Sequence, residues 1–416
     1  MKILYLAPPA RHLGTKLGRY SFLHEEIEGL AEKGLDVYVL VPEIAPPTPN
    51  RVHTHPFESR PDPVAVRCMM RLLATQAGRL PPWNLTQPRK LLQALHVESF
   101  AARVIREEGI QLVHSHFGWP KGFGGLLASR STAIPLVASL HGADILVNRT
   151  IRYGRGRDPF FARSIRRLLA EADRTMYYSD FMRREGVGLG APPERTRVVY
   201  WGTDVQAFAG VANRQSLRAE LGLPPQPLFL AVAGLIERKG LDKVLHALAL
   251  LRDRYAFTFV ACGEGPELSH LRSLAAALGL DDRVRFAGRV ERSLMPKYFA
   301  AADVFLHGAL IEAAGIVLIE AMASGCPVVC TDAGGPSEYI QDGLTGFVVP
   351  VGDAEAMASK TAWLIEHPHQ AAQFGATGRV RAVQYFGRQR MLDQVIEVYA
   401  ELVMQGGRAH EQPVSR

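Results

Sequence analysis

Short apolar runs alternate with longer amphipathic segments along this chain, which is the pattern of parallel strands joined by crossover helices. In the first half the pattern predicts strands at Lys2–Ala7, Val37–Pro42, Gln111–His114, Leu136–His141, Thr175–Tyr178 and Arg197–Trp201. In the second half it begins again and predicts strands at Leu228–Ala233, Thr258–Cys262, Val284–Phe286, Val304–Leu306, Pro327–Thr331 and Gly346–Val349. We therefore expect an α/β protein built from two doubly wound, Rossmann-like units in series.

Helices are predicted between the later strands, at Leu241–Asp253, Glu267–Leu278 and Gly315–Ser324. The Pro-rich stretch at residues 223–227 marks a turn, so the boundary between the units is expected near residues 205–225. The expected domains are residues 1–207, residues 208–385, a helix at 386–405 that packs back toward the first domain, and a polar tail at 406–416. Doubly wound sheets bind ligands at the carboxyl ends of their strands, so we expect one site in a cleft between two facing domains.

The composition is that of an ordinary globular protein, with 416 residues, 47% of them apolar and 21% charged. These values exclude a disordered, collagen-like or coiled-coil chain. The four cysteines lack the paired spacing of metal ligands, which favours a reducing compartment. Because no apolar run reaches the length of a signal peptide or a spanning helix, we expect a cytoplasmic protein whose membrane contact, if any, is peripheral.

The positive charge is confined to the first half of the chain. Residues 1–204 hold 28 Lys and Arg against 19 Asp and Glu, a net of +9, which leaves 48 − 28 = 20 against 41 − 19 = 22 for the remainder. Two segments are rich in arginine: Val64–Trp83, with Arg67, Arg71 and Arg79, and Arg149–Arg167, with seven arginines. The first is either a core-packed helix with a solvated edge or an interfacial membrane helix, and the second is either a solvated loop and helix start or a phosphate-binding patch. On the functional interpretation, both suit an anionic membrane surface or a charged glycan.

One segment of the second half contains several residues that could bind a ligand or take part in catalysis. Glu312 precedes a predicted helix, and Glu320 lies about two turns along it. The free backbone amides of Ala314, Gly315 and Ile316, together with the helix dipole, suit a diphosphate. The alternative is an amphipathic helix with two solvated carboxylates.

Adjacent basic residues end the first strand of the second unit. The planar guanidinium of Arg238 and the ammonium group of Lys239 could hold two phosphates, although such a pair of basic side chains is often only solvated. The glycine turn Cys262–Pro266 is weaker evidence, and we expect it to be structural.

The order of motifs resembles the retaining glycosyltransferases of family 4, which have the GT-B fold. The motifs in the second half are Lys239-Gly240, Gly263-Glu264-Gly265-Pro266, Gly288-x-Val290, Ala302-Asp303-Val304-Phe305, the pair Glu312 and Glu320, Gly334-Gly335-x-x-Glu338 and Asp342-Gly343-x-Thr345-Gly346. Those in the first half are Gly18 before a helix, His114-Ser115-His116-Phe117, Leu140-His141-Gly142-Ala143-Asp144 and Trp201-Gly202-Thr203-Asp204. The resemblance covers essentially the whole chain and implies an acceptor-binding first domain and a donor-binding second domain.

The resemblance also implies roles for residues of the donor domain. Lys239 would bind the donor diphosphate, Glu320 the ribose hydroxyls and Glu312 the hydroxyls of the donor sugar, while the amides of 314–316 hold phosphate. Gly234 stands where many members have an arginine, and Arg238 could replace it. This arrangement is similar to the lipopolysaccharide core transferases and favours a cell-envelope acceptor.

Four further contacts are implied around the donor and the acceptor. Val290 and Gly18 would contact the donor through the backbone, and His116 would lie on the acceptor side. His141 would contact the acceptor or the donor sugar, and we take it with Glu312 as a candidate catalytic residue. The plain alternative for each histidine is a satisfied structural role.

The sequence thus predicts a retaining, metal-independent hexosyltransferase that uses a nucleotide diphosphate sugar and a glycan or lipid-linked acceptor in envelope or exopolysaccharide assembly. No Asp-x-Asp run is present to hold a divalent ion, and no cofactor is expected. The alternatives are a transferase for a soluble small molecule and a non-catalytic nucleotide-sugar-binding scaffold. The arginines lack the aromatic interleaving of a nucleic-acid surface, so nucleic acid is not expected as a partner.

Overall fold

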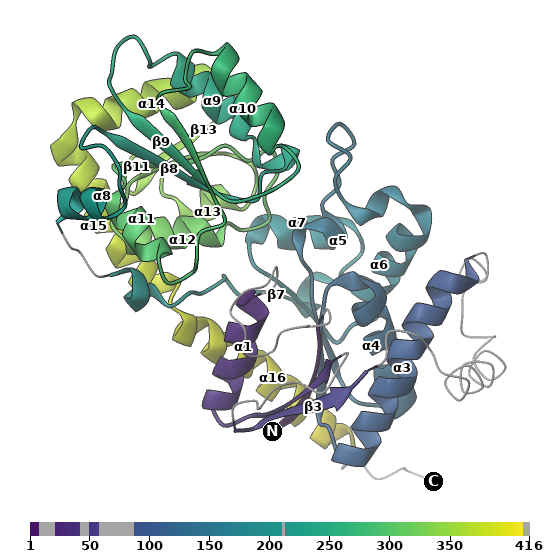
Figure 1. Cartoon of the computed structure of the whole chain (residues 1–416). Helices are drawn as coiled ribbons and strands as arrows, with labels where there is room; N and C mark the ends of the chain where they lie inside the picture. The colour runs from purple at the N-terminus through teal and green to yellow at the C-terminus, as the bar shows by residue number, and fades with distance from the viewer. Residues whose placement is uncertain (8–20, 42–49, 58–86, 210–212, 411–416) are drawn as a thin grey trace, which may run out of the picture. The chain divides into compact units, whose positions relative to one another are not determined.

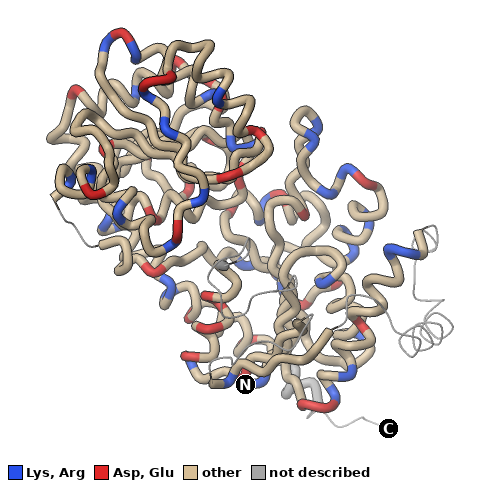
Figure 2. Tube along the Cα trace, in the orientation of Figure 1, with Lys and Arg blue, Asp and Glu red and all other residues tan. Residues whose placement is uncertain are grey.

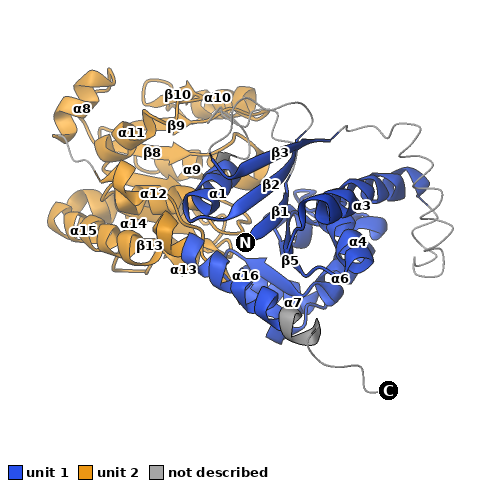
Figure 3. Ribbon diagram, turned by 90° about the horizontal axis from the view of Figure 1, so that it is seen from below, with its two compact units in different colours: residues 1–178, 182–199, 392–416 blue, residues 179–181, 200–391 orange. Residues whose placement is uncertain are grey.

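The computed structural model describes residues 1–7, 21–41, 50–57, 87–209 and 213–410. They form two compact units, coloured separately in Figure 3. Unit 1 comprises Met1–Tyr178, Met182–Val199 and Leu392–Arg416, and unit 2 comprises Ser179–Phe181 and Tyr200–Met391. Of the sequence predictions, Gly18, the basic segment 64–83 and the end of the tail, 411–416, lie outside the described residues.

Unit 1 is built on a parallel sheet with the strand order β3-β2-β1-β4-β5-β6-β7 (Figure 1). Helices α3 and α4 pack on each other and against β1, β4 and β5, whereas α1 packs against β2 and β3. The strands are β1 (Lys2–Leu6), β2 (Asp36–Val41), β3 (Val52–Pro56), β4 (Leu112–His116), β5 (Leu136–Ser139), β6 (Arg174–Tyr177) and β7 (Thr196–Val198). The helices are α1 (Ser21–Glu32), α3 (Pro88–Glu108), η2 (Gly118–Gly122), α4 (Phe123–Thr132), α5 (Gly142–Ile145), η3 (Arg155–Arg157), α6 (Pro159–Glu171), α7 (Asp180–Gly188), η4 (Pro193–Arg195) and α16 (Arg388–His410).

Unit 2 repeats the plan with a parallel sheet of order β10-β9-β8-β11-β12-β13. Its strands are β8 (Leu228–Val232), β9 (Thr258–Cys262), β10 (Val284–Gly288), β11 (Val304–His307), β12 (Val328–Thr331) and β13 (Gly346–Val349). Its helices are η5 (Val205–Phe208), α8 (Arg214–Glu220), η6 (Glu237–Lys239), α9 (Leu241–Ala249), α10 (Leu268–Ala277), α11 (Met295–Ala301), α12 (Ile316–Ala323), α13 (Pro336–Tyr339), α14 (Ala354–Glu366) and α15 (Pro368–Tyr385). Apart from the edge strand β10, which is half exposed, the strands are largely buried, as the continuous apolar runs of the sequence indicate.

The predicted pair of doubly wound units is confirmed, with a few local errors. The edge strand β3 was missed, because it is a short half-exposed segment within a stretch of prolines. Strand β7 ends at Val198, and unit 2 begins at Tyr200, several residues before the predicted boundary. Helix α9 ends at Ala249, earlier than expected.

The C-terminal helix is longer than predicted. Helix α16 continues to His410, so part of the predicted polar tail is helical. From Leu392 onward it belongs to unit 1 although it follows unit 2 in the sequence. Lys33, just after α1, forms an ion pair with Asp393, and the hydroxyl of Tyr399 lies 2.5 Å from Nδ1 of His114. The last helix therefore completes the fold of the first unit.

Candidate active site

The candidate residues of unit 2 gather where the strand order reverses. Strands β8 and β11 are neighbours in the sheet although β9 and β10 lie between them in the sequence. At such a point the loops that follow the two strands run in opposite directions, and ligands of doubly wound sheets bind in the crevice between these loops. Lys239 follows β8 and Glu312 follows β11. The topology thus brings two sequence-predicted residues to one edge of the sheet.

Glu312 forms ion pairs with both predicted cations. Its Oε2 contacts Nζ of Lys239 and lies 3.3 Å from the Arg238 guanidinium. Only 11% of the Glu312 side chain is exposed. Although burial alone would raise it, the charges of Lys239 and Arg238 lower the pKa of Glu312 to about 2. Glu312 is therefore a carboxylate at neutral pH, and in this structure it pairs with both cations that the sequence analysis assigned to phosphate, which leaves the group of three with a net charge of about +1.

The loop from Glu312 to Gly315 is held in place by backbone contacts. Glu312 pairs with Gly334 in a parallel bridge, and the hydroxyl of Ser179 donates to the carbonyl of Ala313 at 2.6 Å. Gly315 has φ 122°, a backbone conformation that residues other than glycine rarely adopt.

Helix α12 begins directly after this loop, at Ile316. The amide groups of its first turn have no acceptor within the helix. The positive end of the helix and the two cations therefore belong to the same loop cluster, which suits an anion with several oxygens.

Glu320 lies on α12 and is almost fully buried. It forms an ion pair with Arg292, whose second nitrogen lies 3.2 Å from the hydroxyl of Thr203. Arg292 was missed by the sequence analysis, since it stands in a loop without a motif around it. The predicted ribose contact is thus occupied by a cation that a ligand would have to share or displace.

Val290, another predicted donor contact, is a partly buried coil residue just after β10. Gly234 stands where the resemblance led us to expect an arginine. It is exposed, and a Cβ built on it would meet only the carbonyl oxygen of Glu264 within 4 Å, at 3.8 Å, so there is room for the first carbon of a side chain.

His307 is a further buried residue of this edge that the sequence analysis missed. It ends β11, and neither of its ring nitrogens has a hydrogen-bond partner among the described residues. Burial and the charge of Lys239 lower the pKa of His307 to about 4, so the ring is neutral. One signal could have found it, because Leu306-His307-Gly308-Ala309 repeats the motif Leu140-His141-Gly142-Ala143 of the first unit.

The predicted histidines of unit 1 are brought together by neighbouring strands. His116 ends β4, and His141 follows β5 and precedes α5. Nδ1 of His116 lies 3.2 Å from Nε2 of His141. The His141 ring stacks on Phe117 with 4.1 Å between centroids, and Asp144 accepts a hydrogen bond from the His141 backbone amide. Burial lowers the pKa of His141 to about 3, so the ring is neutral at physiological pH.

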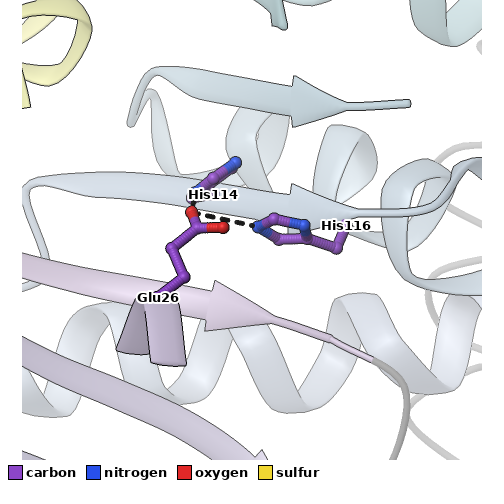
Figure 4. A group of neighbouring side chains, drawn as sticks. All are labelled: Glu26, His114 and His116. Carbon is purple, nitrogen blue, oxygen red and sulfur yellow. Dashed lines mark ion pairs between the residues drawn. The ribbon is translucent and has the colours of Figure 1, made fainter. Parts of the chain in front are cut away.

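A buried carboxylic acid lies behind these histidines. Figure 4 shows Glu26 of α1 pointing toward His114 and His116 on strand β4, with Oε1 3.9 Å and 3.7 Å from their ring nitrogens. All three side chains are at most 1% exposed. Burial raises the pKa of Glu26 to about 8. The sequence analysis did not single out Glu26, because nothing in an amphipathic helix distinguishes an inward glutamate from a solvated one.

The Glu26, His114 and His116 group is the one set of metal-ligating side chains that the described part of the chain brings within 4.8 Å of one another. His114, however, uses both ring nitrogens elsewhere. Its Nε2 lies 2.7 Å from the Ser139 hydroxyl and its Nδ1 faces the Tyr399 hydroxyl. Only two free donors remain, which is fewer than a protein metal site normally supplies. The cluster therefore fits a metal ion poorly.

The second basic segment of unit 1 forms a loop and the start of helix α6. Six of its seven arginines are exposed, and Arg167 is partly buried against Glu171. Figure 2 shows this loop with blue positions at its tip. The six exposed arginines are Arg149, Arg152, Arg155, Arg157, Arg163 and Arg166. Within the described residues, no helix has the length and apolar character needed to cross a bilayer.

Two family descriptions match consecutive parts of the chain. "Glycosyltransferase Family 4" matches residues 21–207, and "Glycosyl transferases group 1" matches residues 213–381. The two matches meet close to the junction of the two units.

Curated relatives match along most of their length. A GDP-mannose-dependent alpha-(1-6)-phosphatidylinositol monomannoside mannosyltransferase from Mycolicibacterium smegmatis is 32% identical over 292 residues, which are 68% of this chain and 74% of the relative. A D-inositol 3-phosphate glycosyltransferase from an Arthrobacter species is 30% identical over 96% of this chain and 94% of its own.

Solved structures share the whole fold. The Anabaena protein HepE, in complex with UDP, superposes with a TM-score of 0.74 at 23% identity, over 97% of this chain and all of its own. A sucrose-phosphate synthase from Thermosynechococcus elongatus gives 0.77 at 23% identity, over 97% of this chain and 99% of its own.

Proposed function

This chain belongs to the group 1, family 4 glycosyltransferases, and from that premise we propose that it moves a hexose from a nucleotide diphosphate sugar to a saccharide or lipid-linked acceptor. The transfer retains the anomeric configuration and needs no metal ion, and it serves the assembly of the cell envelope or of an exopolysaccharide. In this proposal unit 2 binds the donor and unit 1 binds the acceptor.

The observation that supports the donor site is the cluster of Arg238, Lys239 and the start of helix α12 at one edge of the unit 2 sheet. Glycosyl transfer builds negative charge on the departing diphosphate. Fixed cations and helix amides that are already in place stabilise that charge without reorganisation. They supply what a divalent ion supplies in transferases with an Asp-x-Asp run, which this sequence lacks.

Glu312 has a double role in this proposal. Before the donor binds, it holds Lys239 and Arg238 in place. The diphosphate then takes over the cations, and the carboxylate becomes available to accept hydrogen bonds from the sugar hydroxyls. Because its pKa is low, Glu312 stays ionised and does not act as a general acid. The reaction follows a front-face route, in which the departing phosphate oxygen takes the proton of the acceptor hydroxyl.

His141 is the proposed contact of unit 1 to the acceptor. The ring is neutral and half-buried, and its Nε2 already faces His116. A neutral imidazole in this position can orient an acceptor hydroxyl through its remaining nitrogen without adding charge.

Nucleotide binding tests the donor assignment directly. Thermal shifts are measured with UDP, GDP, ADP and their sugars in EDTA; a ligand at about 100 times its Kd adds about 2.7 kcal/mol of stability. Lys239→Ala should abolish the shift, whereas Lys243→Ala, which removes an exposed lysine of α9, should not. A shift that needs Mn²⁺ or Mg²⁺ would contradict the metal-independent site.

Gly234 favours the second candidate, a non-catalytic binding protein, because the usual arginine is absent there. The open space around Gly234 allows the residue to be restored. If the chain is an enzyme, the wild type hydrolyses or transfers from the donor, and Gly234→Arg tightens nucleotide binding. A wild type that binds the donor but neither hydrolyses nor transfers it, with activity appearing only in Gly234→Arg, indicates a scaffold.

The envelope setting is supported by the exposed arginines of unit 1 and by the phosphatidylinositol monomannoside in the name of the mycobacterial relative. Reversal of Arg149, Arg152 and Arg163 to glutamate should lower co-sedimentation with vesicles that contain anionic lipid, and salt should weaken the wild-type binding. Equal sedimentation of both proteins would favour an acceptor free in solution.

A further inference from the structure

Glu26 is buried without a cation beside it. Its side chain is 1% exposed, and neither carboxylate oxygen has a hydrogen-bond partner among the described residues. An ionised carboxylate in such a place is costly, so the group remains protonated at neutral pH, in keeping with its raised pKa. A neutral carboxyl has one O–H to donate, and that proton needs an acceptor nearby.

One acceptor that faces this carboxyl is Nε2 of His116, and the Tyr5 hydroxyl also lies close to Glu26. This nitrogen is buried, has no hydrogen-bond partner among the described residues, and lies 3.7 Å from Oε1 of Glu26. The separation exceeds a hydrogen bond by a few tenths of an ångström, and rotation of the carboxyl group about its last bond, a soft torsion, can close it. The other nitrogen of His116, Nδ1, faces Nε2 of His141 at 3.2 Å.

The His116 ring is held so that both nitrogens keep these partners. Tyr5 of β1 stacks on the His116 ring with 4.5 Å between centroids and 29° between planes. The centroid of the His114 ring, two residues earlier on β4, lies 4.2 Å from that of His116. A ring packed in this way resists turning over, which would put ring carbons in the places of the two nitrogens. If Nε2 accepts a hydrogen bond from the Glu26 O–H, then Nδ1 of the neutral ring carries the hydrogen that points at His141.

We propose that Glu26 and His116 are positioning residues for His141, joined in a hydrogen-bonded chain that runs from the Glu26 O–H to His116 and from the His116 Nδ1–H to Nε2 of His141. This chain fixes His141 as the tautomer with its hydrogen on Nδ1 and leaves that N–H to hold an oxygen of the acceptor. Each donor in the chain then has one acceptor, and no group in it carries a charge. The proposal rests on the function proposed above for His141.

Asp144 accepts a hydrogen bond from the backbone amide of His141, and burial raises its pKa to about 6, so this carboxyl is mostly ionised at pH 7. The other titratable groups around these three side chains do not supply a charge. They are Tyr5 on β1, Tyr178 after β6, His114 on β4 and Tyr399 on α16. Burial raises the pKa of Tyr5 and Tyr399 and lowers that of His114 to about 3, so all three are neutral.

The first test reads the tautomer of His141 without any reaction. Long-range ¹H–¹⁵N NMR spectra of the imidazoles distinguish a hydrogen on Nδ1 from one on Nε2, and His141→Asn assigns the signal. We expect the Nδ1–H form in the wild type and a mixture in His116→Phe. An Nε2–H form in the wild type overturns the proposal. Because this measurement needs no substrate, it tests the hydrogen-bonded chain from Glu26 to His141 even if the proposed transferase function is wrong.

The second test separates positioning from packing. His116→Phe and Glu26→Met should lower kcat at least tenfold and leave the Kd for the nucleoside diphosphate within twofold. Glu26→Gln should keep most of kcat, because its amide N–H replaces the carboxylic O–H as donor to His116. Tyr399→Phe is the matched control, since it removes an equally buried hydrogen bond from His114, outside the chain.

Three outcomes overturn the inference. Equal loss of kcat in Tyr399→Phe and His116→Phe would reduce the chain to core packing. A Glu26→Gln variant as impaired as Glu26→Met would require a charged Glu26 in place of a neutral donor. One equivalent of metal in the purified protein, lost in Glu26→Gln and His116→Phe, would make the cluster a metal centre. Thermal midpoints of all variants, measured alongside, show whether a lost kcat merely follows unfolding.

Discussion

Glu312→Gln removes the one carboxylate that the described residues bring to Arg238 and Lys239 together. The two cations lower the pKa of Glu312 from 4.5 to about 2. A difference of between two and three pKa units corresponds to about 3 kcal/mol. Breaking a buried ion pair by removing one partner costs about 3–5 kcal/mol in other proteins, since the remaining charge stays buried. We therefore expect the free energy of unfolding to fall by about 3 kcal/mol at pH 7.

The pH dependence of this loss has a defined sign. The pKa of Glu312 is lower in the folded state than in the unfolded chain, so its stabilisation is present above about pH 4.5 and is lost as the pH falls toward 2. Urea unfolding of the wild type and Glu312→Gln at pH 7 and pH 4 measures it. The two proteins should differ less at the lower pH. Glu237→Gln, an exposed neighbour on η6, is the control and should stay within about 0.5 kcal/mol of the wild type.

The same variant separates donor binding from turnover. Without Glu312 the diphosphate no longer competes for Lys239, so the Kd of the nucleoside diphosphate should be unchanged or lower, measured by titration calorimetry. The kcat should fall by more than tenfold, because the sugar hydroxyls lose their acceptor. A Kd weakened by the same factor as kcat, or a stability equal to that of Glu237→Gln, would refute the reasoning.

Three further predictions concern stability and the loop at the donor site. Glu26→Gln should gain stability over the wild type as the pH rises from about 4.5 to 8, by up to ~1.4 kcal/mol per pH unit, because only the wild type must keep a carboxyl group protonated in the folded state. Urea unfolding of both proteins across this pH range measures the difference, and a difference that does not change with pH would contradict a buried neutral acid. Arg218→Met should lose about 3–5 kcal/mol, since the buried guanidinium pairs with Asp303 and caps the carbonyls of Ala301, Pro225 and Gln226, while nucleotide affinity stays unchanged in the calorimeter. Gly335→Ala places a Cβ 2.3 Å from the carbonyl oxygen of Ala313. It should lower the free energy of unfolding by about 1–3 kcal/mol and weaken donor binding. A donor affinity equal to that of the wild type would show that the loop can move aside freely.

Much of the fold could be predicted because it depends on local pattern. The buried parallel strands are near-continuous apolar runs, and β9 and β13 match their predicted bounds. The edge strand β3 escaped prediction because its residues are half exposed and lie among prolines. The bounds of α9 and β7 were wrong by a few residues, where capping and packing, not periodicity, end the element.

The candidate site was predictable only where a motif fixes the position of a residue along the chain. Glu312, Lys239 and His141 each lie between a strand and the α-helix that follows it, so the sequence indicates which edge of the sheet they reach. Arg292 and Glu26 carry no such mark. Their importance comes from the partner that the fold places beside them, which is Glu320 for the first and His116 for the second.

The sequence by itself determined the two doubly wound units, the family and the strand ends at which the chemistry is expected, because these follow from periodicity and ordered motifs. Only the tertiary structure decided the charge states. Whether a carboxyl group is an anion or a neutral acid depends on how much water and which charges surround it, and residues distant in sequence supply both. Glu312 is held ionised by two cations, whereas Glu26 is buried among neutral rings and stays protonated.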